Sequence, residues 1–207
     1  MGCIMSKGTV LSLFDHSTNM VEPWANNGYE CIAVDLKHTE GEKHPHRNIT
    51  TVKADIGEYL PPIRDYEIVF AFPPCTNLAV SGARWFKDKG LSGLSDGIKH
   101  VERSRRIAEW SNAEWMIENP VSTLSTYWRK PDYTFHPYEY DGYTERNESY
   151  SKKTCLWTSE GFIMPETKAA DEYDDRIHKM PPGEKRSEKR SETPMGFAQA
   201  VYEANHV

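Results

Sequence analysis

The stretch IVFAFPPCTNLAVSG, residues 68–82, indicates the architecture of the whole chain. It begins as a short apolar run rich in residues that favour β-strands, and it stops at Pro73 and Pro74. One cysteine, Cys75, follows directly. A buried strand that ends in a rigid turn places this thiol at the carboxyl edge of a sheet, where open α/β sheets bind their ligands.

Cys75 allows two interpretations. A lone cysteine is commonly a small buried hydrophobic residue. A thiol with a pKa of about 8.5 becomes a good nucleophile when a cation such as Arg84, a helix N-terminus or a general base favours the thiolate. A second apolar stretch, WMIENP at residues 115–120, ends in a carboxylate, that of Glu118. A thiol and a carboxylate at two neighbouring strand ends predict a nucleophile and an acid that act together.

Strand and helix patterns alternate along the chain. Strands are expected at residues 9–14, 30–35, 50–53, 66–72, 114–118 and 153–157, and helices at 20–27, 96–111 and 195–205. This alternation predicts an α/β fold with a mostly parallel sheet and helices on both faces. The aromatic stretch 133–150 is expected to pack over a sheet edge more readily than to stack on a base. With 207 residues, of which 38% are hydrophobic and 27% charged, the chain suits one domain, residues 1–207.

Composition narrows the class of protein. Four cysteines without paired spacing and a start without an apolar signal region predict reduced thiols and a cytoplasmic location. No run of about 18 apolar residues occurs, so no membrane partner is expected. His38, His44 and His46 have no cysteine or carboxylate pair at ligand spacing beside them, so no metal site is expected.

The charge pattern matters more than the net charge of −6, which argues against a general polyanion binder. Residues 179–190 are rich in lysine and arginine, and a solvated loop and a phosphate-contacting loop are equally consistent with that pattern. For Arg103, Arg105 and Arg106, a solvated helix face is the favoured interpretation.

The turn after the first predicted strand reads FDHSTNM at residues 14–20 and contains no glycine, so a dinucleotide is not expected there. Asp35 lies about twenty residues beyond this turn, where a carboxylate accepts hydrogen bonds from both hydroxyls of a ribose. Asp55, one strand later, is placed to accept from an adenine amine. The alternative for each aspartate is a helix cap or a turn. An adenosine without a pyrophosphate suggests S-adenosylmethionine.

Six segments follow one another in a distinctive order. They are LSLFD near the start, VD at 34–35, FAFPPCTNLAVSGARWF at 70–86, ENPVSTLS at 118–125, SKKTCLW at 151–157 and SETPMGFAQAVYEAN at 191–205. Together they resemble the small, phage-type members of the DNA cytosine-5 methyltransferase superfamily. The resemblance implies a Rossmann-like, S-adenosylmethionine-dependent methyltransferase that acts on double-stranded DNA with the target cytosine flipped out of the stack. A phage protein of this kind would work in the cytoplasm of a bacterial host.

The resemblance also implies a mechanism. Carbon 5 of cytosine is too poor a nucleophile to take a methyl group directly, so the thiolate of Cys75 first adds to carbon 6. Glu118 matches the acid that stabilises the ring at N3, and Asn119 matches the residue that orders the loop. Carbon 5 then takes the methyl group, and a base, which the sequence does not identify, removes the carbon 5 proton.

Further site residues follow from the same resemblance. Those expected at the cofactor are Phe14, Asp15, Ser17, Thr18, Asn19, Asp35, Leu36, Asp55, Ile56 and Pro73. Those expected at the substrate are Pro74, Ser81, Arg84, Lys153 and Thr154.

The chain departs from the family pattern in four places. The first cofactor turn lacks glycines, and Glu118 and Asn119 are followed by Pro120 where the family usually has valine. Lys152, Lys153 and Thr154 stand where larger members have an arginine pair, and only residues 158–192 fill the place of a recognition region of many tens of residues. Weak or short sequence recognition is therefore expected, or recognition that a partner supplies. Two alternatives remain open: modification of carbon 5 of a pyrimidine in a free nucleotide or in RNA, and a non-catalytic protein that binds the cofactor.

Overall fold

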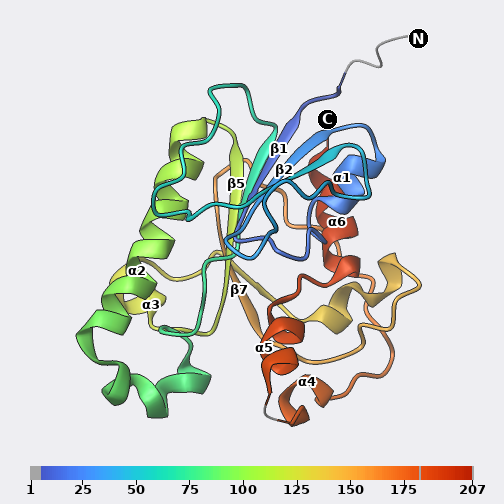
Figure 1. The fold of residues 1–207 in the computed structure, drawn as a ribbon. Coiled ribbons are helices and arrows are strands. Elements are labelled where there is room, and N and C mark those ends of the chain that lie inside the picture. Colours follow the sequence, from blue (N-terminus) through green and yellow to red (C-terminus); the bar gives the residue numbers. More distant parts are fainter. Residues whose placement is uncertain (1–5, 182, 207) are drawn as a thin grey trace.

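A seven-stranded sheet in the order β3-β2-β1-β4-β5-β7-β6 forms the centre of the computed structural model (Figure 1). The strands are β1 (Thr9–Leu13), β2 (Glu30–Val34), β3 (Ile49–Val52), β4 (Ile68–Ala71), β5 (Glu114–Pro120), β6 (Tyr133–Phe135) and β7 (Thr154–Thr158). β1 to β5 pair in parallel, whereas β7 runs antiparallel to both of its neighbours. The expected mostly parallel, Rossmann-like sheet is confirmed. The structure describes residues 6–181 and 183–206, without the side chains of residues 184, 185 and 187.

Helices cover both faces of the sheet. They are α1 (Glu22–Asn26), α2 (Phe86–Ser111), α3 (Leu124–Tyr127), α4 (Arg176–Lys179), α5 (Glu184–Ser191) and α6 (Met195–Asn205), with the 3-10 helices η1 (Val80–Trp85) and η2 (Pro137–Tyr143). Figure 1 shows α2 on one side of the sheet and α1 with α6 on the other. Successive side chains of a strand point to opposite faces of the sheet, so the strands contribute to a hydrophobic core on each face. Val69 and Ile117 pack toward α2, whereas Phe70 and Met116 pack toward α1 and α6. No helix in the described part of the chain is long and apolar enough to cross a membrane.

The predicted element boundaries agree with the structure to within two residues, with one large exception. The helix expected from residue 96 begins at Phe86 and contains Gly90, whose φ of 62° joins two helical pieces at a kink. The first turns carry Leu91, which is exposed, so their sequence lacks the apolar period that marks the later part. Strand β6 was not predicted either. In the aromatic stretch, Phe135 and Tyr140 are buried in the core, so the expected packing role is confirmed for these two rings.

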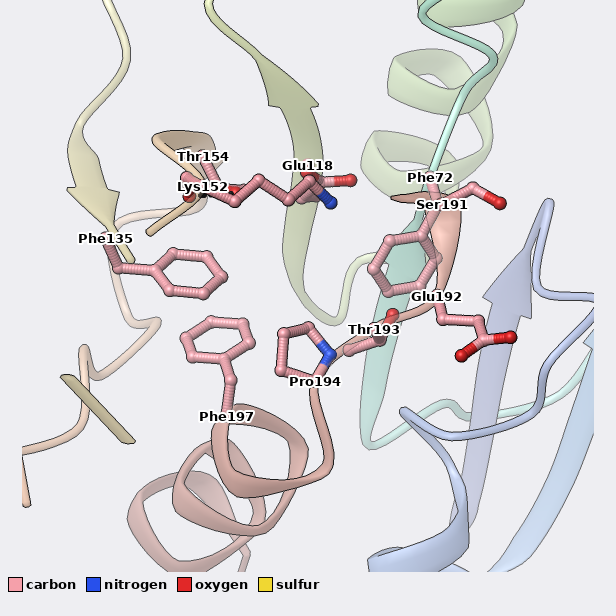
Figure 2. Close-up of a pocket in the computed structure, with 10 residues that line it drawn as sticks. All are labelled: Phe72, Glu118, Phe135, Lys152, Thr154, Ser191, Glu192, Thr193, Pro194 and Phe197. Carbon is pink, nitrogen blue, oxygen red and sulfur yellow. Dashed lines mark hydrogen bonds between the residues drawn. The ribbon is translucent and has the colours of Figure 1, made fainter. Parts of the chain in front are cut away.

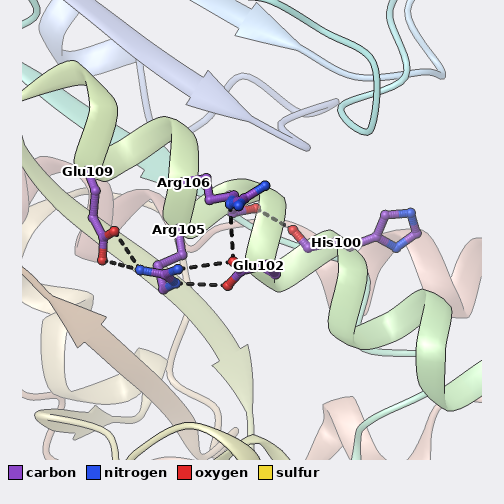
Figure 3. A network of polar contacts seen from close by, with 6 residues as sticks. His100, Glu102, Arg105, Arg106 and Glu109 are labelled. Carbon is purple, nitrogen blue, oxygen red and sulfur yellow. Dashed lines mark hydrogen bonds and ion pairs between the residues drawn. The ribbon is translucent and has the colours of Figure 1, made fainter.

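Each of the three arginines of α2 contacts a glutamate side chain or a backbone carbonyl of the same chain. Arg105 lies between two carboxylates, with distances of 2.9 Å from its Nε to Glu102 and 2.5 Å from its Nη1 to Glu109 (Figure 3). Arg106 also pairs with Glu102, at 3.3 Å. Arg103 instead donates hydrogen bonds to backbone carbonyls of the loop after β3. The favoured interpretation as a solvated helix face holds for Arg105 and Arg106, and such surface pairs contribute little stability.

Candidate active site

The ends of β4 and β5 bring the three candidate catalytic residues together. The two strands pair in parallel, so both end at the same edge of the sheet. Cys75 follows β4 across Pro73 and Pro74, and Glu118 and Asn119 lie in the last part of β5. The side-chain amide of Asn119 donates a hydrogen bond of 2.9 Å to the carbonyl oxygen of Pro73. This bond ties the turn that carries Cys75 to the strand that carries Glu118.

The pKa values of Cys75 and Glu118 depend on burial and on nearby charges. Burial, and then the charge of Glu118, raises the pKa of the Cys75 thiol, whereas the cations Lys152 and Arg190 lower it. Burial also raises the pKa of Glu118, and Lys152 opposes that rise. Among the described residues, no hydrogen-bond partner reaches the buried Oε1 atom of Glu118. A buried carboxyl with a raised pKa keeps its proton to higher pH and is suited to donate it to a bound ligand.

A small cavity opens beside Glu118 (Figure 2). Its lining consists of Phe72, Glu118, Phe135, Lys152, Thr154, Ser191, Glu192, Thr193, Pro194 and Phe197. Figure 2 shows Lys152 alongside Glu118, and the rings of Phe135 and Phe197 face each other with centroids 3.9 Å apart. The cavity volume of about 10 Å³ is room for about one water molecule. A pyrimidine ring is larger than this cavity, so it can enter the cavity only if some of the lining residues move.

The turn after β1 is built around the side chain of Asp15. This buried carboxylate accepts hydrogen bonds from Ser12 Oγ at 2.8 Å, from the backbone N–H of Thr18 at 2.8 Å and from Ser17 Oγ at 3.2 Å. Asp15, expected at the cofactor, thus points into the protein and holds the turn. Phe14 and Thr18 have φ angles of 57° and 60°, which is the left-handed region that favours glycine. The turn keeps a backbone shape typical of glycine without having one.

Two aspartates end the strands next to this turn. Asp35 follows β2, and its Oδ1 accepts a hydrogen bond of 2.8 Å from the N–H of Lys37. Asp55 follows β3, and its Oδ1 accepts one of 2.8 Å from the N–H of Gly57. In each case no hydrogen bond among the described residues uses Oδ2, so both carboxylates keep an oxygen free for a ligand. Leu36 is 62% exposed beside them.

Two other expected cofactor residues have structural contacts. Ile56 is buried in the core on the α2 side of the sheet. The side-chain amide of Asn19 donates a hydrogen bond of 2.9 Å to the carbonyl oxygen of Thr193. Asn19 thereby joins the turn after β1 to the segment that lines the cavity beside Glu118.

The expected substrate residues differ in exposure. Pro74, Ser81, Arg84 and Lys153 are exposed, whereas Thr154 is buried and lines the cavity. The guanidinium of Arg84 lies over the Trp85 ring, 5.2 Å from its centroid. Lys152 lines the cavity, although the sequence indicated only Lys153 and Thr154 as substrate residues. The two-residue period of an extended chain is the signal that pairs Lys152 with Thr154 on one face.

The other reactive groups of the chain are free thiols and side chains that can bind metals. Cys31, Cys75 and Cys155 are free thiols, and Cys3 lies outside the described residues. Within residues 6–181 and 183–206, no three histidine, cysteine, aspartate or glutamate side chains gather in a way that could hold a metal ion.

Replacing Asp15 by alanine should lower the free energy of unfolding by about 1–3 kcal/mol, because three donors lose their buried acceptor. Urea denaturation measures the loss. The matched control is Asp55→Ala, which removes an exposed turn aspartate and should have a smaller effect. Equal stabilities for the two variants would contradict a structural role for Asp15.

Comparisons with known proteins concern the fold. No family model matches the chain, and no curated protein matches its sequence. Among solved structures, the CcbJ methyltransferase from Streptomyces caelestis is 16% identical over 54% of this chain and 43% of its own, with a TM-score of 0.34. A TehB-like S-adenosylmethionine-dependent methyltransferase from Corynebacterium glutamicum is 10% identical over 56% and 57%, with a TM-score of 0.33. The glycopeptide N-methyltransferase MtfA is 14% identical over 76% and 66%, with a TM-score of 0.35.

Proposed function

We propose that the protein transfers the methyl group of S-adenosylmethionine to carbon 5 of a cytosine in DNA, through a covalent adduct between Cys75 and carbon 6. The observation that supports this most is the pairing of Cys75 with Glu118 at neighbouring strand ends. The charge of Glu118 affects the pKa of Cys75, and its Oε1 is buried without a partner among the described residues. A nucleophile beside an unpartnered acid suits attack on a ring that must accept a proton.

The proposed reaction begins at the thiolate of Cys75. The thiolate of Cys75 forms a bond to carbon 6, and the electron pair of the ring moves toward N3, where Glu118 donates its proton. When bound, S-adenosylmethionine would supply an electrophilic methyl group, which carbon 5 takes as the bond from sulfur to methyl breaks and S-adenosylhomocysteine leaves. Loss of the carbon 5 proton to a base restores the double bond, the Cys75 sulfur leaves carbon 6, and N3 returns its proton to Glu118.

The edge formed by β1, β2 and β3 supports the choice of cofactor. Asp35 and Asp55 stand at consecutive strand ends, and each keeps one carboxylate oxygen free, as hydrogen bonding to a ribose and an adenine requires. The exposed side chain of Leu36 offers an apolar surface for the adenine ring. Because the turn after β1 lacks the glycines that cradle a pyrophosphate, an adenosine without one is the better fit.

DNA is the proposed partner, with the cytosine flipped out of the duplex because carbon 6 is inaccessible in the stack. Residues 158–192 contain the short helices α4 and α5 in place of a large recognition region. This small insert supports weak sequence recognition, and it also favours a second candidate substrate, a pyrimidine in a free nucleotide or in RNA.

Lys152→Met should shift the pH dependence of methyl transfer. Because the Lys152 ammonium lowers the pKa of both Cys75 and Glu118, its loss should raise both and move the activity profile to higher pH. Each pKa unit changes the thiolate fraction below the pKa about tenfold. Initial rates measured from pH 5 to pH 10 test this, and Lys152→Arg should restore the profile. An unshifted profile in the methionine variant would remove Lys152 from this role.

Mass spectrometry of nucleosides tests the proposed function. Duplex DNA, RNA and free cytidine nucleotides are each incubated with the protein and S-adenosylmethionine, and 5-methylcytosine is quantified. Product in DNA alone supports the proposal, and product in RNA or nucleotides alone moves the function to the second candidate. No product in any substrate, with the cofactor bound, would leave a non-catalytic cofactor-binding protein.

A further inference from the structure

A second cavity, of about 210 Å³, lies between the turn after β1 and the long loop that joins β2 to β3. Its lining consists of His16, Ser17, Thr18, Lys37, His38, Thr39, Glu42, Lys43, His44, Pro45 and Thr51. It shares no lining residue with the cavity at Glu118. One water molecule takes about 30 Å³ in the liquid, so the cavity is large enough for a small polyatomic ion.

The lining carries an excess of positive charge. Lys37 and Lys43 are exposed, and no ion pair between described residues includes either of them. Glu42 is the single carboxylate in the lining. On a protein with a net charge of −6, two ammonium groups that form no ion pair at one cavity, against one carboxylate, mark a local site for an anion.

Hydrogen bonds determine which ring nitrogen carries the proton in His44 and His38 of this cavity. His44 Nδ1 accepts from the N–H of His46 at 3.0 Å, so the proton of a neutral ring lies on Nε2, which contacts Thr18 Oγ1 at 3.2 Å. His38 Nε2 lies 3.2 Å from the carbonyl oxygen of Asp15, which can only accept, so this nitrogen is also protonated.

The same hydrogen bonds occupy the Nε2 atoms of His38 and His44, which carry protons and so offer no lone pair to a metal ion. Burial and the neighbouring ring of His16, whose centroid lies 5.4 Å away, lower the pKa of His38. The positive charge of the site therefore comes from the two lysines, which suit an oxyanion as point charges.

We propose that this cavity is a binding site for a phosphate-type oxyanion, either free phosphate or a phosphate of a nucleic-acid backbone. Lys37 and Lys43 provide the charge, and the rings of His16 and His38 lie in contact in the lining. The cavity shares no lining residue with the one at Glu118, but Ser17 and Thr18, which are expected at the cofactor, belong to its lining, so the site adjoins the proposed cofactor site.

Calorimetric titration with inorganic phosphate at constant ionic strength tests the site. Lys37→Gln combined with Lys43→Gln should weaken phosphate binding about tenfold or more. The matched control, Lys99→Gln combined with Lys130→Gln, removes the same charge from exposed lysines outside the cavity and should bind as the unaltered protein does.

A second titration distinguishes the two sources of the oxyanion. If a backbone phosphate occupies the cavity, the Lys37/Lys43 variant should bind duplex DNA more weakly, and the slope of log affinity against log salt should fall by about 1. If free phosphate is the ligand, DNA affinity should match that of the control variant while phosphate binding is lost. Unchanged binding of both ligands would overturn the site.

Saturating S-adenosylhomocysteine should leave phosphate affinity unchanged. Competition between the two would assign the cavity to the carboxylate of the cofactor and overturn a separate oxyanion site. Because phosphate affinity is measured without any reaction, failure of the proposed methyl transfer leaves this result intact.

Discussion

Replacing Cys75 by alanine should reduce formation of 5-methylcytosine in DNA about 10⁴-fold or more, because the covalent step has no substitute nucleophile. The side chain follows β4 at the edge where Glu118 lies, and alanine removes only the sulfur. Nucleoside mass spectrometry and single-turnover kinetics measure the loss. Binding of S-adenosylhomocysteine should be retained, because the proposed cofactor residues follow β1, β2 and β3.

Cys155→Ala is the matched control for that experiment. Cys155 is a free thiol on the neighbouring strand β7, and its pKa is raised by burial and by the charge of Glu118. Loss of its sulfur should leave transfer within a few-fold of the unaltered protein. If transfer survives in Cys75→Ala but not in Cys155→Ala, the nucleophile is Cys155, and the proposal is wrong.

Replacing Glu118 by glutamine should lower transfer about 10²- to 10⁴-fold, the usual contribution of a general acid. Its raised pKa keeps the carboxyl protonated to higher pH than usual, so activity is expected to fall as pH rises through that pKa. The raised pKa of Cys75 acts in the other direction, because the thiolate forms as pH rises. The unaltered protein should therefore show a bell-shaped profile.

The glutamine variant should lose the falling limb of that profile. The rising limb should remain, because the thiolate of Cys75 still forms as pH rises and a neutral glutamine carries the same charge as the protonated Glu118 of the active form. Glu114→Gln, at the exposed start of the same strand, is the control and should keep the full bell shape. A bell-shaped profile in Glu118→Gln would show that another group titrates on the falling limb.

Local sequence patterns predicted the parts of the molecule that depend on short-range order. The apolar runs before Cys75 and Glu118 indicated two neighbouring strands, and the period in α2 indicated which face Val101 and Ile107 present to the core. The carboxyl ends of those strands followed from parallel pairing alone. The sheet and the closeness of Cys75 to Glu118 were therefore predictable.

Long-range contacts determine what the sequence did not predict. The role of Asp15 depends on donors arranged by a tight turn, and the lining of the cavity beside Glu118 depends on where residues 191–194 return to the sheet. Strand β6 has three residues and gains its order from pairing with β7. Lys152 was noted as a departure from a pattern, and its approach to Glu118 depends on which edge of the sheet the chain has reached before β7 begins.

The reversed direction of β7 determines where a DNA-reading module could be engineered into this scaffold. The chain enters β7 at the edge that holds Glu118 and leaves it at the opposite edge, beside Trp115. The first and last of the five residues of β7 are four steps of about 3.4 Å apart, which separates those ends by about 14 Å. A module grafted directly after Thr158 would start at the edge of the sheet opposite to the one that holds Glu118. The better insertion point is the end of the return path, next to α5, where the chain has come back to the cavity beside Glu118.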